Sequence, residues 1–177
     1  TSEGNYSIKL RKKIDTNEIE EIWNGDKEKE KLGVEYFGIG DLEVSHNDKY
    51  LAYSLDIKGS EYFSIFIREI ANNKIISKEI TDTSGSILFS LDNKYIFYSK
   101  LDKNHRARKI FRHEIGNFQN TDELIFEEKS DAFTVGIALS SDEKYYFIST
   151  SDHNTSEQYF FKVDEKKPQP KLIKKRK

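Results

Sequence analysis

Apolar and aromatic runs recur along this chain, and each follows a short polar cluster. The run Ser45–Asp56 reads S-H-N-D-K-Y-L-A-Y-S-L-D, and similar runs begin at Ser90 and Ser140. Serine followed by Asn or Asp favours a tight turn, because these side chains bond their own backbone and Asn and Asp tolerate left-handed angles. The aromatic and β-branched residues that follow favour a buried strand. Each copy therefore predicts a turn and then a strand.

The spacing of these runs predicts the architecture. Their shared Lys-Tyr pairs start at Lys49, Lys94 and Lys144, which lie 45 (94 − 49) and 50 (144 − 94) residues apart. Repeats of about 40 to 50 residues with strand-like runs are typical of propeller blades. We therefore predict an all-β fold, a partial β-propeller of about three and a half four-stranded antiparallel blades.

Turn residues between the apolar runs set the expected limits of these blades. The predicted single domain spans residues 1–177, with a half blade over 1–26 and blades over 39–80, 83–128 and 133–174. Lys27–Leu32 is charged enough for a short helical turn before the first full blade. The fourth strand of that blade is expected at Lys74–Ile80, and the first strand of the next at Ser86–Phe89.

Composition narrows the class of protein. Of the 177 residues, 36% are hydrophobic, 34% charged and 13% aromatic, which is polar but too aromatic for a disordered chain. The net charge of -2 gives no overall attraction to nucleic acid or anionic lipid. No apolar run reaches the roughly 18 residues of a membrane span. The absence of Cys excludes disulfides and thiolate sites, so we expect a cytoplasmic protein. Because Met is absent even at position 1, we interpret the sequence as a fragment or a processed form.

Catalytic serine patterns are missing from the sequence. The nucleophile elbow G-x-S-x-G, which needs glycines on both sides of the serine, does not occur. The nearest match, Thr83–Ser86, is expected to form the turn into an inner strand. Ser151, Asp152 and His153 are three residue types of a catalytic triad, yet neighbours in an extended chain point to opposite faces. We therefore predict no catalytic residue in this chain.

Histidine spacing argues against a metal site. The four histidines do not show the H-x-x-x-H or H-E-x-x-H spacing that places two imidazoles on one metal, so no metal and no cofactor is expected. Each is expected to be a surface or interface residue with satisfied hydrogen bonds. They are His46, His105, His113 and His153.

Basic residues gather in two places. The first is the stretch from His105-Arg106 to Arg112-His113, which with Arg108 and Lys109 is expected to face acidic groups of another domain. Acidic residues throughout the chain argue against nucleic acid as the partner. The second is the tail Lys171–Lys177, interpreted as a frayed end, with a lipid-binding or RNA-binding tail as the alternative.

An ordered set of short motifs extends along nearly the whole chain. It comprises Asn24-Gly25, Glu35-Tyr36-Phe37, Glu43-Val44-Ser45, Leu51-Ala52-Tyr53-Ser54 with Asp56, Gly59-Ser60-Glu61, Thr83-Ser84-Gly85-Ser86, His105-Arg106, Arg112-His113 with Ile115-Gly116, Leu124 with Phe126-Glu127-Glu128-Lys129, and Thr155-Ser156-Glu157 before Pro168. In this order and spacing, the chain resembles the N-terminal β-propeller of the prolyl oligopeptidase family of serine peptidases, most closely its oligopeptidase B branch.

The resemblance implies a non-catalytic part of a larger enzyme. In the family a propeller of about seven blades, within the natural range, caps an α/β-hydrolase domain and restricts access to peptides. Oligopeptidase B members cleave after Lys or Arg through acidic groups of the catalytic domain, which has no counterpart here. The implied partners are that domain and, in the full enzyme, peptides. The alternative is a free-standing interaction module, in which two copies complete a ring through exposed blade faces.

Overall fold

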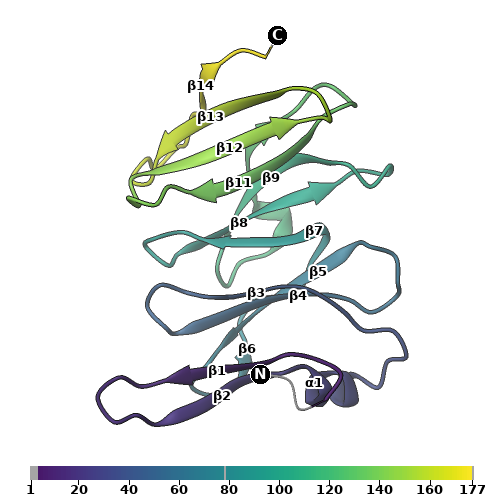
Figure 1. Cartoon of the computed structure of the whole chain (residues 1–177), viewed down its shortest axis with the longest axis vertical. Coiled ribbons are helices and arrows are strands. Elements are labelled where there is room, and N and C mark those ends of the chain that lie inside the picture. The colour runs from purple at the N-terminus through teal and green to yellow at the C-terminus, as the bar shows by residue number, and fades with distance from the viewer. Residues whose placement is uncertain (1–3, 78, 177) are drawn as a thin grey trace.

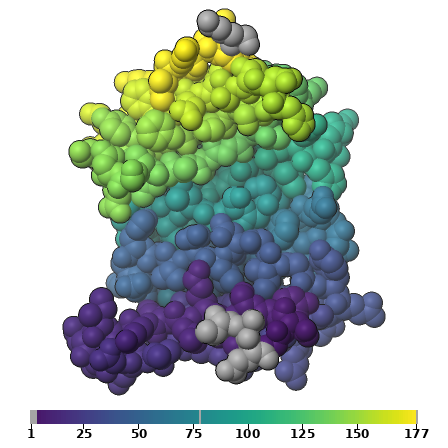
Figure 2. Space-filling model, in the orientation of Figure 1, coloured from purple at the N-terminus to yellow at the C-terminus, as the bar shows by residue number. Residues whose placement is uncertain are grey.

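The computed structural model describes residues 4–77 and 79–176 and shows a column of antiparallel sheets. Figure 1 shows these sheets stacked along the long axis of the molecule, with the first hairpin at one end and the last sheet at the other. In Figure 2 the colours follow one another in bands, so each part of the chain contacts chiefly its neighbours in sequence. This layered arrangement confirms the predicted all-β partial propeller.

The first layers hold the N-terminal hairpin, the helix and the first part of an eight-stranded sheet, here called the first sheet. Strands β1 (Ile8–Lys12) and β2 (Ile19–Asn24) form the hairpin, and α1 (Gly25–Leu32) follows directly. Asn24 begins the helix, because its side chain accepts a hydrogen bond from the Lys27 amide at 3.2 Å. The strands after the helix are β3 (Gly38–Val44), β4 (Tyr50–Asp56), β5 (Phe63–Glu69) and β6 (Lys74–Ile75).

The later layers hold two further sets of strands. The next set is β7 (Ile80–Phe89), β8 (Tyr95–Leu101), β9 (Ala107–Glu114) and β10 (Glu123–Glu127), with a 3-10 turn at Gln119–Thr121 before β10. The last sheet is β11 (Thr134–Leu139), β12 (Tyr145–Ser151), β13 (Ser156–Lys162) and β14 (Lys171–Lys174). Within the described residues, no helix has the length and apolar character of a membrane-spanning segment.

Strand β7 differs from the sequence prediction, because one strand serves two layers. Ile80 and Thr83, near its start, pair with β5, whereas Ile87 to Phe89 pair with β8. The expected strand at Lys74–Ile80 is therefore wrong in part, since β6 covers only its first two residues. The predicted turn at Thr83–Ser86 is also wrong. That segment continues the strand through an irregularity at Gly85, whose φ of 91° favours glycine.

The repeated Ser-x-[Asn/Asp] clusters form the predicted turns with the same hydrogen bonds each time. The Ser45 hydroxyl donates to Asn47 Oδ1 at 2.8 Å and accepts from the Tyr50 amide at 2.9 Å. Ser90 and Ser140 make the equivalent bonds in their own turns. The residue before each Lys-Tyr pair has a positive φ, at Asp48, Asn93 and Glu143.

Hydrophobic clusters fill the spaces between adjacent layers. One lies between the hairpin and the first sheet and includes Trp23, Leu51 and Tyr53. The next joins β4 and β5 to β7 and β8, and another joins β8, β9 and β10 to the last sheet. Because the side chains of a strand alternate between its two faces, each middle sheet contributes to the core on both sides. The layers are thus held together mainly by the burial of these side chains.

Candidate functional site

Ser151, Asp152 and His153, which the sequence analysis set aside as a catalytic triad, lie at the end of a strand and in the turn that follows it. Ser151 ends β12, and the Asp152 carboxylate accepts hydrogen bonds from the amides of Asn154 and Thr155 at 2.8 and 2.7 Å. These two bonds lower the pKa of Asp152. Neither Ser151 nor His153 contacts this carboxylate by a side-chain hydrogen bond among the described residues. The three side chains therefore form no proton relay.

The histidines lie in two kinds of environment. His46 and His153 are exposed in turns, and His105 stacks on Tyr62 with ring centroids 4.2 Å apart. His113, in contrast, is completely buried at 0% exposure, so the prediction of a surface or interface position is wrong for this residue. The described residues contain no group of three or more His, Asp or Glu side chains placed to hold a metal ion.

A buried polar network surrounds His113. Its Nδ1 lies 2.7 Å from Asp122 Oδ1, and its Nε2 lies 3.5 Å from Ser77 Oγ. The Tyr98 hydroxyl donates to the other oxygen of Asp122 at 2.8 Å, and the Gly116 amide donates to Ser77 Oγ at 2.8 Å. Burial raises the pKa of Tyr98, and its hydrogen bond to Asp122 adds to this shift. The network joins the segment before β7 to β9 and to the turn before β10.

Ser77, His113 and Asp122 are the residue types of a serine hydrolase relay, and His113 lies between the other two side chains. Ser77 and His113 are only 2% and 0% exposed, so a substrate cannot reach them. The hydroxyl of Ser77 already accepts a backbone hydrogen bond, and no glycine lies two residues from it on either side. The arrangement can satisfy buried polar groups, but it lacks the access that acyl transfer needs.

Most of the predicted basic patch is paired within the chain. Arg112 contacts Glu123 and its guanidinium lies 4.5 Å from the centre of the Tyr95 ring. Arg108 pairs with Asp131, and Lys109 Nζ lies 3.5 Å from Glu127 Oε1. Arg108, Lys109 and Arg112 therefore already have acidic partners within the chain, and the expected contact of this stretch with acidic groups of another domain stays a prediction. In the part of the chain that the structure describes, His105 and Arg106 remain exposed and without ion pairs.

The basic tail is also engaged rather than frayed up to its last described residue. Arg176 Nη1 lies 2.9 Å from Glu128 Oε2 and 3.4 Å from Glu157 Oε2, and its guanidinium lies 3.8 Å from the centre of the Phe133 ring. Both carboxylates are buried, at 5% and 7% exposure. The prediction of a frayed end is therefore wrong for the described part of the tail; Lys177 lies outside the described residues.

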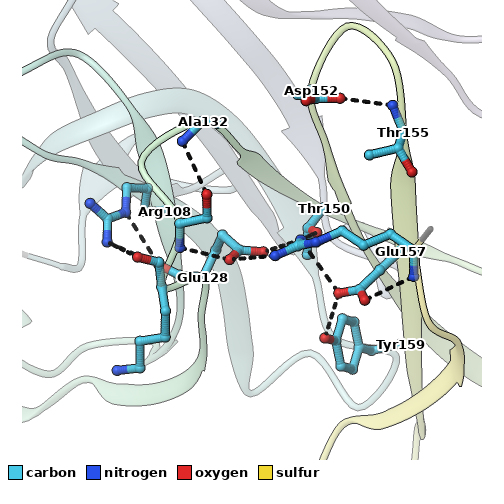
Figure 3. A network of polar contacts seen from close by, with 11 residues as sticks. Arg108, Glu128, Ala132, Thr150, Asp152, Thr155, Glu157 and Tyr159 are labelled. Carbon is cyan, nitrogen blue, oxygen red and sulfur yellow. Dashed lines mark hydrogen bonds and ion pairs between the residues drawn. The ribbon is translucent and has the colours of Figure 1, made fainter.

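Figure 3 shows how this network connects two sheets: Glu128 follows β10 of one sheet, and Thr150 and Glu157 belong to the last sheet. Thr150 Oγ1 accepts a further hydrogen bond from Arg176 at 3.1 Å, and the Tyr159 hydroxyl donates to Glu157 at 3.0 Å. The hydrogen bond from Arg176 is the largest cause that lowers the pKa of Glu128 to about 2. Sequence reasoning missed this network, because its members are far apart in the chain.

A comparable ion pair fixes the helix to the first sheet. Arg68 Nη1 lies 2.6 Å from Glu28 Oε1, and Nη2 donates to the Ile22 carbonyl at 2.6 Å. The guanidinium also lies 5.2 and 5.4 Å from the ring centres of Trp23 and Tyr53. The side chains of Arg68 and Glu28 are 5% and 13% exposed, so solvent screens their attraction only weakly. The ion pairs of Arg68 and Arg176 thus join neighbouring layers.

Comparison with known proteins shows which proteins this chain is similar to. The family model of the prolyl oligopeptidase N-terminal β-propeller domain matches residues 2–177. Protease 2 of Moraxella lacunata is 30% identical over 132 residues, which cover 73% of this chain and 19% of that protein. Dipeptidyl aminopeptidase BI of Pseudoxanthomonas mexicana is 29% identical over 71% of this chain and 17% of that protein. The chain thus spans about a fifth of the length of these curated relatives.

Solved structures show the same arrangement of strands. Oligopeptidase B from Leishmania major superposes with a TM-score of 0.85 at 20% identity, over 94% of this chain and 23% of that one. Oligopeptidase B from Trypanosoma brucei, with covalently bound antipain, gives a TM-score of 0.82 at 24% identity over the same shares. At this level of identity the likeness concerns the fold.

Proposed function

The chain belongs to the prolyl oligopeptidase family, as part of its N-terminal β-propeller domain, and from this premise we propose that it is a non-catalytic portion of a substrate-gating propeller. The parent family is one of serine peptidases. In this proposal the catalytic serine, aspartate and histidine belong to a separate α/β-hydrolase domain. That domain is the partner of the chain, and the propeller admits peptides and excludes folded proteins.

The observation that carries the proposal is the family match over residues 2–177 together with the roles of the serine and histidine residues. The sequence has no nucleophile elbow, and the Ser77–His113–Asp122 arrangement is buried. The ion pairs of Arg68 and Arg176 join layers and leave both arginines committed to carboxylates. These features support a structural role for the chain in gating.

We propose further that the complete enzyme cleaves after Lys or Arg and acts in the cytoplasm. The specificity rests on the resemblance to the oligopeptidase B branch and on the fold shared with the two trypanosomatid oligopeptidases B. The location rests on the absence of cysteine, which fits a reducing compartment.

Two assays test the proposal. First, the purified chain is incubated with an arginyl-amide reporter, and we expect no release of the reporter amine. Turnover that survives repurification and is blocked by a serine-directed inhibitor would contradict the non-catalytic role. A matched pair of variants, Ser77→Ala and Ser84→Ala, would then show whether the turnover depends on the buried Ser77 or on a serine of β7.

Second, the chain is mixed with a separately expressed oligopeptidase B catalytic domain. We expect the complex to cleave short peptides after Lys or Arg and to leave a folded protein substrate intact, whereas the catalytic domain alone discriminates less. Equal cleavage of the folded protein with and without the chain would contradict gating. Failure to bind the catalytic domain at all would favour the alternative, an independent interaction module.

A further inference from the structure

A cavity of about 530 Å³ lies between α1 and the outer part of the first sheet. Its size falls within the range of about 300 to 1,000 Å³ that is usual for sites of small ligands. Leu32 from α1, Tyr53 and Leu55 from β4, Phe66 from β5 and Ile75 from β6 form its apolar walls. None of these residues belongs to the polar networks around His113 and Arg176.

The apolar walls combine two aromatic rings with exposed aliphatic groups. The rings of Tyr53 and Phe66 are stacked, with centroids 5.5 Å apart and an angle of 23° between their planes. Leu32, Ile57 and Ile75 are 45%, 42% and 45% exposed although they are large apolar residues. Exposed apolar side chains that gather around a cavity mark a place where a ligand can bury them.

The rim of the cavity carries charges of both signs. Lys31 of α1 and Lys58 of the β4–β5 turn, here called the lysine side, make no ion pair within the described residues. Glu79 and Asp82, here called the acid side, lie before and within β7. Glu79 makes no ion pair in the described part of the chain, and Asp82 Oδ2 lies 4.0 Å from Lys100 Nζ, a weak exposed pair.

The other two carboxylates of the rim are already committed. Asp56 accepts hydrogen bonds from the amides of Lys58, Gly59 and Glu61, at 2.9, 3.0 and 2.7 Å. Glu28 pairs with Arg68. The charges that remain for a ligand are therefore those of the lysine side and the acid side, which balance each other.

Tyr53 adds a polar group to the apolar surface. It is only 5% exposed, and its hydroxyl makes no hydrogen bond to any described residue. Burial raises the pKa of Tyr53 to about 12, so the hydroxyl keeps its proton at neutral pH. Because Tyr53 lines the cavity, a ligand there can exchange a hydrogen bond with this hydroxyl.

We propose that this cavity binds a short zwitterionic peptide with an aromatic or aliphatic side chain. The side chain packs against the rings of Tyr53 and Phe66, the α-carboxylate faces the lysine side, and the α-ammonium faces the acid side. This complementarity in both polarity and charge selects a short peptide over a purely apolar molecule or a simple ion. The inference depends on the cavity alone, and it does not require the chain to be part of a peptidase.

The single tryptophan of the chain offers a reporter for this site. Trp23 is 1% exposed, and its ring lies 4.6 Å from that of Tyr53, which forms a wall of the cavity. We would titrate the chain with the tripeptide Ala-Phe-Ala and follow Trp23 fluorescence, with amide chemical shifts from NMR as an independent readout. Saturable changes are expected. N-acetylated and C-amidated Ala-Phe-Ala, and also Ala-Ser-Ala, are expected to bind about tenfold more weakly.

Variants of exposed residues separate the cavity from other surfaces. Leu32→Ser and Ile75→Ser are expected to weaken Ala-Phe-Ala binding about fivefold or more while circular dichroism stays unchanged, because both side chains are half-exposed. The matched control is Ile14→Ser, which alters a residue that is 91% exposed in the β1–β2 turn. The affinity of Ile14→Ser for Ala-Phe-Ala should equal that of the unaltered chain.

Three outcomes would overturn the proposal. They are the absence of any saturable signal in fluorescence and NMR up to about 10 mM peptide, equal affinity for Ala-Phe-Ala and Ala-Ser-Ala, and equal loss of affinity in Ile14→Ser and Leu32→Ser. None of them bears on the gating proposal, whose readout is the cleavage of substrates by a complex with the catalytic domain. The two proposals therefore fail independently.

Discussion

At the scale of single residues, the serines that open the repeated turns have a defined structural role. Ser90 is 6% exposed; its hydroxyl donates to Asp92 Oδ1 at 2.7 Å and accepts from the Tyr95 amide at 3.0 Å. One side chain thus satisfies both a carboxylate and the first amide of the following strand. The repeated sequence reflects this geometric requirement, and it carries no catalytic function.

Replacing Ser90 by alanine should therefore destabilise the chain. Ser90→Ala leaves the partly buried Tyr95 amide without its acceptor, which should lower the free energy of unfolding by about 1 kcal/mol. Ser141→Ala, in the equivalent turn of the next repeat, changes an exposed serine and should have an effect below about 0.5 kcal/mol. Urea unfolding at pH 7 measures both. Equal midpoints for the two variants would refute the assigned role.

The residue that closes each turn gives a second prediction. Glu143 adopts a φ of 56°, a left-handed conformation that Asn tolerates better than Glu. Glu143→Asn should raise the free energy of unfolding by about 0.5 kcal/mol. The reverse change, Asn93→Glu, should lower it by more than that, since Asn93 Oδ1 also accepts from the Asn47 amide at 3.1 Å. Thermal unfolding provides the comparison; a loss of stability in Glu143→Asn would contradict the argument.

His113 shows where residue-level prediction failed. A histidine among charged neighbours in β9 was expected at the surface, yet its strand neighbour across the sheet, Ile96, is also completely buried. Burial depends on which strand face meets the next layer, and the compensating partners Ser77 and Asp122 are 36 and 9 residues away. A single sequence shows neither the face nor the partners. This is why the network could not be predicted.

At the scale of elements, the turns and most strands follow from local sequence, whereas the sharing of strands between layers does not. The Ser-Gly-Ser stretch of β7 has the composition of a turn, but tertiary pairing extends the strand through it. Similarly, nothing local indicates that Arg176 meets Glu128, which is 48 residues away. Contacts of this kind arise only when the layers stack.

The Arg176 network should make stability depend on pH. The pKa of Glu128 is lowered in the folded chain to about 2, so its stabilising contribution is complete above the unfolded value near 4.5 and is lost as the pH falls from there toward 2. Arg176→Ala should lower the free energy of unfolding at pH 7, because it leaves the buried carboxylates of Glu128 and Glu157 without their cation. The difference in the free energy of unfolding between Arg176→Ala and the unaltered chain should shrink steadily below pH 4.5.

Urea unfolding at several pH values tests this dependence. Lys175→Ala is the matched control, because Lys175 is an exposed neighbour of the same tail and has no ion pair within the described residues. It should change stability little at any pH. A difference between Arg176→Ala and the unaltered chain that stays constant from pH 7 to about pH 2.5 would show that the carboxylate of Glu128 does not mediate the effect.

At the scale of the whole molecule, the stacking of layers determines how the chain is stabilised. Adjacent layers bury their facing side chains against each other, so stability should accumulate from contacts between adjacent layers, as in repeat proteins. The periodicity of the sequence was sufficient to predict this architecture. The polar networks between layers and the cavity beside α1 were not predictable, because they combine side chains from elements that only the stack brings together.

The outer face of the last sheet supplies the final prediction. Tyr146 and Ile148 of β12 are buried toward the preceding layer, so the alternating residues Tyr145 and Phe147 face away from it, and Phe160 of β13 lies opposite Phe147. This face resembles the covered faces inside the stack. We expect the isolated chain to self-associate through it at high concentration, because burial of these rings is favourable.

Phe147→Ser combined with Phe160→Ser should abolish this association and leave the thermal midpoint nearly unchanged, since both residues are only partly buried. Phe161→Ser, one position away but 2% exposed and facing the core, should instead lower the free energy of unfolding by about 3 kcal/mol or more. Light scattering across a range of concentrations and thermal unfolding distinguish the two effects. A strictly monomeric unaltered chain at high concentration would rule out self-assembly and leave the hydrolase domain as the favoured partner.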